Sequence, residues 1–183
     1  MTRFVDRLVL LLRRLAAFFL DYMILAIYIV VLTVTFMFTG LGQTSVVMQA
    51  FSHPISAQLL AMVLLTIPVI VYFTAFERSA WQGTPGKRLL GLAVVTEADE
   101  RPGWGRTLAR SVVKFLPWEL AHTMMWRIPG WPAEVEYIPR FVYFGYAVMW
   151  LLVLIYLFSP LFDRRMRTPY DRVSGCRVVL RGR

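Results

Sequence analysis

The sequence has very few of the residues that enzymes and metal proteins use. Among 183 residues there is one cysteine, Cys176, and there are two histidines, His53 and His122. One cysteine excludes an intramolecular disulfide and a CxxC pair. The sequence contains no G-x-S-x-G or H-E-x-x-H motif, and its two histidines lie on separate segments. We therefore expect no enzymatic activity, no metal site and no cofactor.

Charge is absent from long stretches of the chain. From Leu15 to Phe38 the only charged residue is Asp21, and residues 55–76 and 141–162 carry no charge at all. As a helix rising ~1.5 Å per residue, the first run extends over ~36 Å, enough to cross a hydrocarbon core of ~30 Å. With 58% hydrophobic residues, the chain is predicted to be an all-α membrane protein.

Basic residues flank these runs and predict the topology. The formal net charge is +9, which we attribute to membrane orientation and anionic lipid head groups and not to nucleic-acid binding. The basic N-terminus and the uncharged connection 39–54 favour a cytoplasmic N-terminus. Three spans would export a tail with seven arginines, against the positive-inside rule: Arg164, Arg165, Arg167, Arg172, Arg177, Arg181 and Arg183.

If the semi-polar segment 107–127 also crosses the membrane, the arginine-rich tail stays in the cytoplasm and the positive-inside rule is obeyed. We predict a single domain, 1–183, with about four spans at 15–38, 55–76, 107–127 and 141–162. The loop 77–105 and the tail 163–183 would then be cytoplasmic, as would both termini. In the alternative topology, the third helix is interfacial or re-entrant and the tail lies outside.

Two short segments outside the spans read as β-strands. Leu89–Val95 and Gly175–Gly182 both contain the pattern G-x-x-V-V, and both are bounded by turn residues. They predict a small two-stranded β element in the cytoplasm.

Three sequence patterns together resemble one protein family. They are R-x-x-A-x-x-x-D at Arg14, Ala17 and Asp21, WQGTPGKRLLGLAVV at 81–95, and RTPYDRVSGCRVV at 167–179. These are similar to the RDD family of small bacterial membrane proteins, whose name-giving residues fall on Arg14, Asp21 and Asp171. The sequence departs from the family pattern at two positions: Tyr170 stands where a histidine is common, and Cys176 where a threonine is common. The resemblance implies an inner-membrane protein, with transport suggested and cation/proton antiport proposed for some members.

The three family residues have two interpretations. In the functional one, Asp21 is a titratable carboxylate that exchanges a proton for a cation, and Arg14 tunes this exchange. In the structural one, Arg14 bonds Asp171 and holds the tail, while Asp21 bonds a backbone amide, a threonine or a tyrosine. Asp21 is equally compatible with both, whereas the structural contact is the better interpretation for Arg14 and Asp171.

Glu119 and His122 are spaced three residues apart and share a helix face. They either form a proton relay with Asp21 or form a hydrogen-bonded pair that makes the helix semi-polar.

The remaining basic residues near the spans are expected at lipid phosphates. Segment 83–88 (GTPGKR) is not a phosphate-binding loop, because its glycines are too close and Arg88 follows the lysine. Glu77 could pair with Lys87 at the interface. Head-group contacts are predicted for Lys87, Arg88, Arg106, Arg110 and Lys114.

Two functions follow from these observations. One is a transporter that exchanges protons for a small cation through Asp21; so few helices would then need a homo-oligomer or a partner membrane protein to enclose a path. The other is a non-catalytic scaffold or accessory subunit that binds a protein through its loop and tail.

Overall fold

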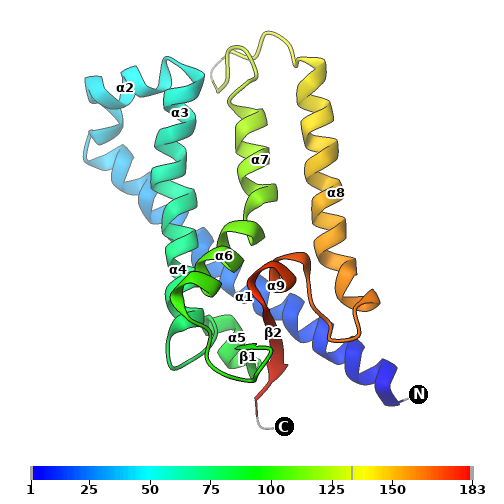
Figure 1. The fold of residues 1–183 in the computed structure, drawn as a ribbon. Coiled ribbons are helices and arrows are strands. Elements are labelled where there is room, and N and C mark those ends of the chain that lie inside the picture. Colours follow the sequence, from blue (N-terminus) through cyan, green and yellow to red (C-terminus); the bar gives the residue numbers. More distant parts are fainter. Residues whose placement is uncertain (1, 133, 182–183) are drawn as a thin grey trace. The chain divides into compact units, whose positions relative to one another are not determined.

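The computed structural model describes residues 2–132 and 134–181, which are mostly helical (Figure 1). The chain divides into two compact units. Unit 1 comprises Met1–Leu25, Val69–Lys114 and Leu154–Arg183, and unit 2 comprises Ala26–Pro68 and Phe115–Val153. Several long helices therefore contribute one part to each unit.

Three helical segments in the described part of the chain are long and apolar enough to cross a membrane. The first lies in α1 (Thr2–Phe38), and the third is α8 (Arg140–Phe162). The second is built from α3 (Pro54–Ala61), the π-helical turn η2 (Met62–Thr66) and α4 (Ile67–Arg78). They correspond to the predicted spans 15–38, 55–76 and 141–162. Between the first two lie η1 (Leu41–Gln43) and α2 (Ser45–Phe51).

The predicted continuous helix 107–127 is instead two shorter helices. α6 (Trp104–Lys114) ends one residue before α7 (Leu116–Met125), and Phe115 lies between them. Pro117 explains the break, because it has no amide to donate to the carbonyl of Val113. That carbonyl accepts a hydrogen bond from the Tyr156 hydroxyl at 2.7 Å.

Pro68 disturbs the second long segment in a similar way. The π-helical turn comes directly before it, and the Ile67 amide donates to the carbonyl of Met62. Pro68 cannot donate to the carbonyl of Leu64 four residues earlier. The Tyr28 hydroxyl donates to this carbonyl at 2.6 Å, so a tyrosine from α1 replaces the missing helical hydrogen bond.

In unit 2, polar side chains join α7 to the second long segment. Gln58 Nε2 donates to Thr123 Oγ1 at 2.8 Å, and Thr66 Oγ1 donates to Glu119 Oε2 at 2.7 Å. The earlier residue of one segment thus pairs with the later residue of the other, so α7 runs antiparallel to residues 58–66. Arg127 Nη1 extends the contact with a hydrogen bond to Gln58 Oε1 at 2.9 Å.

Unit 1 contains the predicted β element. β1 (Leu92–Thr96) pairs antiparallel with β2 (Cys176–Leu180), with Leu92 opposite Leu180 (Figure 1). Alternate residues of both strands bury one face of this pair against Ala17 of α1. Short helices precede both strands: α5 (Pro85–Leu89) and α9 (Pro169–Ser174). The two-stranded pairing expected from the repeated G-x-x-V-V pattern is confirmed.

We predict that Tyr28→Phe lowers the free energy of unfolding in detergent micelles by about 1 kcal/mol, because it leaves the Leu64 carbonyl without a donor. Tyr143→Phe is the matched control in unit 2, since the Tyr143 side chain is 61% exposed and should change stability little. Equal unfolding midpoints for Tyr28→Phe and wild type would contradict the role assigned to Tyr28.

Candidate functional site: a buried ionic network in unit 1

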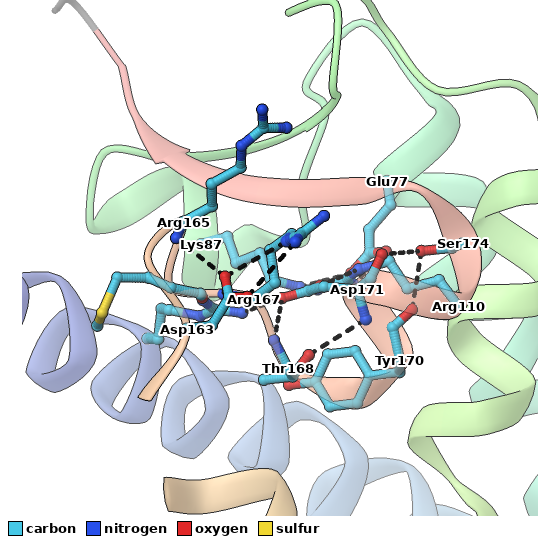
Figure 2. A network of polar contacts seen from close by, with 12 residues as sticks. Glu77, Lys87, Arg110, Asp163, Arg165, Arg167, Thr168, Tyr170, Asp171 and Ser174 are labelled. Carbon is cyan, nitrogen blue, oxygen red and sulfur yellow. Dashed lines mark hydrogen bonds and ion pairs between the residues drawn. The ribbon is translucent and has the colours of Figure 1, made fainter. Parts of the chain in front are cut away.

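Several charged residues of unit 1 lie in its interior. Glu77 and Asp171 are 0% exposed and Arg110 is 1% exposed. Figure 2 shows their side chains close together. Burying an unpaired charge costs several kcal/mol, so such groups persist only with close partners of opposite charge. These three side chains come from α4, α9 and α6 respectively.

Arg110 bridges the two buried carboxylates. Its Nη1 donates to Glu77 Oε1 at 2.5 Å and to Oε2 at 2.6 Å, while its Nε donates to Asp171 Oδ1 at 2.8 Å. The planar guanidinium can bind both carboxylates at once because its donors point in several fixed directions. The Tyr170 ring lies 5.1 Å from its central carbon. Lys87 Nζ gives Glu77 a second ion pair at 2.5 Å, as the sequence suggested.

Asp171 also receives the N-terminal arginine predicted for it. Arg14 Nη2 donates to Asp171 Oδ2 at 2.5 Å, and Arg14 Nη1 donates to the carbonyl of Met166. The Thr168 amide donates to Asp171 Oδ2 at 3.1 Å, completing a capping box at the start of α9. Burial raises the pKa of Asp171, but Arg110 and Arg14 outweigh this effect and hold that pKa well below its usual range.

Asp21 forms a separate polar centre in unit 1. It is 1% exposed and accepts three hydrogen bonds: from the Thr84 hydroxyl, from the Gly86 amide at 3.0 Å and from the Tyr72 hydroxyl at 3.2 Å. The structural interpretation of Asp21 named an amide, a threonine or a tyrosine, and all three are present. They attach α1 to α4 and to the start of α5.

Two of the five predicted lipid contacts do not hold in this fold. Lys87 and Arg110 are 7% and 1% exposed, because both point inward to the carboxylates described above. Lys114 Nζ lies 3.4 Å from the centroid of the Phe73 ring. Arg88 and Arg106 are exposed and remain available to head groups.

Glu119 and His122 lie in unit 2, where each contacts a different residue. Glu119 accepts the Thr66 hydroxyl, and His122 Nδ1 lies 3.0 Å from the Trp118 carbonyl. No hydrogen bond joins Glu119 to His122 in the part of the chain that the structure describes. Their relay with Asp21 stays a prediction.

A second arginine contact joins the two ends of the chain and was not predicted from the sequence. Arg7 Nη2 donates to the carbonyl of Asp163 at 2.5 Å, and Arg7 Nε approaches Met166 Sδ at 3.2 Å. Asp163 itself accepts the amides of Arg165 and Arg167 at 2.9 and 3.0 Å. Burial raises the pKa of Asp163, but hydrogen bonds from these donors have the larger effect and lower the pKa to about 2. The seven-residue spacing of Arg7 and Arg14, which places them on one helix face, was the available signal.

Chemically, the network is suited to holding segments together. Asp21, Glu77 and Asp171 each accept at least two hydrogen bonds from within the chain. Donors of this kind stabilise the ionised carboxylate and occupy its lone pairs.

We predict that Arg110→Met lowers the free energy of unfolding by about 3–5 kcal/mol, because Glu77 and Asp171 stay buried with fewer cationic partners. Thermal unfolding in detergent measures this effect. Arg106→Met, on the exposed side of the same helix, should change stability by less than about 1 kcal/mol. Similar midpoints for the two variants would show that the network is not stabilising.

We predict that Gly86→Ala detaches α5 from α1. A Cβ at Gly86 would overlap the carbonyl oxygen of Ala17 and lie 2.9 Å from Asp21 Oδ1, so the backbone must move apart. Limited proteolysis within 79–103 should become at least several times faster. Gly105→Ala is the control, since nothing lies within 4 Å of its Cβ position. Equal cleavage rates would argue against this close contact.

Comparison with known proteins identifies the family of the chain. A sequence profile of the RDD family matches residues 8–175, which include Arg14, Asp21, Glu77, Arg110 and Asp171. A search of curated proteins and a search of solved structures find no match. The profile covers nearly the whole chain, and the chain therefore belongs to the RDD family of membrane proteins.

Proposed function

We propose that this protein is a non-catalytic membrane scaffold or accessory subunit, in which the buried network holds the loop 77–105 and the tail 163–183 as a rigid platform for a protein partner. The observation that carries this proposal is the state of the three buried carboxylates. Asp21, Glu77 and Asp171 are all engaged by donors of the same chain, as expected of groups that fix a structure. An exchange site would need a carboxylate that readily releases its partners.

The platform is proposed to lie in the cytoplasm of a bacterium, below a four-pass inner-membrane bundle. Arg14 near the start of α1 contacts Asp171, which follows α8 by nine positions. An even number of crossings between them would place both residues on the same side of the membrane, which supports four spans. The antiparallel course of α7 along residues 58–66 supports α7 as part of the additional crossing. The arginine-rich ends then favour the cytoplasmic side.

Proton/cation exchange at Asp21 is the second candidate function. The Thr84 and Tyr72 hydroxyl oxygens both contact the Asp21 carboxylate, and small hard cations prefer such oxygen ligands. Cation binding would have to displace the protons that these hydroxyls donate. In this mechanism a homo-oligomer or a partner membrane protein encloses the path.

We predict that a photo-crosslinking amino acid at Arg101, exposed between β1 and α6, forms one discrete adduct with a membrane-associated protein in cells. The same probe at Gln43, exposed in the connection between the first two long helices, is the matched control and should form none. The adduct at position 101 should decrease several-fold in Gly86→Ala, because that variant loosens the platform.

A measurement of proton flux distinguishes the scaffold from the exchanger. Purified protein in liposomes would be pulsed with Na⁺, K⁺ or Li⁺ while a dye reports the internal pH. The scaffold proposal expects equal dye responses from wild type, Asp21→Asn and empty liposomes. Cation-driven flux in wild type that is lost in a folded Asp21→Asn protein would overturn it and identify Asp21 as the exchange site.

A further inference from the structure

We propose that α6 is an interfacial helix whose outer face contacts lipid, with an anionic bilayer surface as its partner. This assignment does not depend on the scaffold function. It concerns a face of α6 opposite to the one that carries the ionic network.

The buried side of α6 is polar. Thr107 and Ser111 are 0% exposed and Arg110 is 1% exposed. Their spacing of three and four residues places them on one helix face, which packs against α4 and α9 through the contacts of Arg110. A surface helix of a water-soluble domain would place apolar residues on this side.

One exposed stripe of α6 is apolar. Trp104, Leu108 and Val112 are 61%, 49% and 42% exposed. They follow one another at intervals of four residues and so form a stripe along the outer face. A helix that buries its polar face and exposes its apolar one matches an environment of hydrocarbon.

The neighbours of α6 place it at the depth of the membrane boundary. At its start, the Trp104 ring lies 5.9 Å from the guanidinium carbon of Arg78, the last residue of the second apolar segment. At its end, Lys114 Nζ lies 5.6 Å from the centroid of the Phe18 ring, just inside the apolar run of α1. The Val113 carbonyl bonds Tyr156, six residues before the end of α8. Six residues correspond to ~9 Å of helix, so α6 descends from the head groups to a level ~9 Å inside the end of α8, a depth that interfacial helices reach.

Paired tryptophans and arginines mark the same boundary. Trp104 lies under Arg78, and the exposed Trp81 lies 4.2 Å from the guanidinium carbon of Arg88. Tryptophan prefers the interface, and arginines there attract anionic head groups. Arg88 and the exposed Arg106 supply the positive charge.

Lipid fits this face better than a protein partner. A protein interface combines an apolar centre with a polar rim, whereas the exposed stripe of α6 is apolar from its start to its last turn. At the end of α6, Lys114 meets Phe18, which is 42% exposed within the apolar run of α1. The last turn of α6 thus lies beside a helix surface that is itself apolar and exposed.

Spin labels on the full chain in vesicles test this assignment. In a Cys176→Ser background, Leu108→Cys would be labelled on the outer face of α6, and Arg101→Cys would serve as the aqueous control. In vesicles of phosphatidylethanolamine and phosphatidylglycerol, we expect the label at 108 to collide with oxygen several-fold more often than with a water-soluble nickel complex. The label at 101 should show the reverse.

Three outcomes would overturn the assignment. Free access of the nickel complex to position 108 would place α6 in water. Poor access of both reagents would mean that a second copy or another protein covers the stripe. If replacing phosphatidylglycerol by phosphatidylcholine leaves the oxygen preference unchanged, the anionic partner is wrong. Val112→Cys repeats the measurement one turn further along the stripe if the variant at 108 fails to fold.

Discussion

The cost of burying charge without a partner governs the structure of unit 1. Arg110 has almost no access to solvent, and the two carboxylates that it binds come from segments far apart in the sequence. None of these groups can be buried alone without a penalty of several kcal/mol. The segments that carry Glu77, Arg110, Asp171 and Arg14 therefore assemble together. This mutual dependence turns a loop and a tail whose helices and strands are short into a defined unit.

Backbone carbonyls that lose their helical donor to a proline also need a partner. Pro68 and Pro117 each leave a carbonyl four residues upstream without its helical donor. In both cases a tyrosine hydroxyl from another long helix supplies the hydrogen bond. An irregular backbone in an apolar environment is tolerated when such donors are at hand. The tyrosines of α1 and α8 thus join helices at the points where the helices are weakest.

The sequence predicts those features that depend on composition or on local pattern. Long uncharged runs identify the three apolar segments, the repeated G-x-x-V-V pattern identifies the strand pair, and the family pattern identifies the contact of Arg14 with Asp171. The orientation of α6 could not be predicted in this way. Periodicity shows that Arg110 and Lys114 share a face, but which face is buried depends on whether water or lipid surrounds the helix. In water, charged residues are expected on the exposed face of a helix. In this fold Arg110 lies on the buried face instead.

The contact between Arg14 and Asp171 also sets an order of events during biosynthesis. Arg14 leaves the ribosome more than a hundred residues before its carboxylate partner, and Arg110 leaves some sixty residues before it. The first long helices are therefore synthesised before the aspartate that Arg14 and Arg110 share. Head-group phosphates can hold these cations in the meantime. Membrane insertion and the closure of unit 1 are consequently separate steps, and the second waits for the tail.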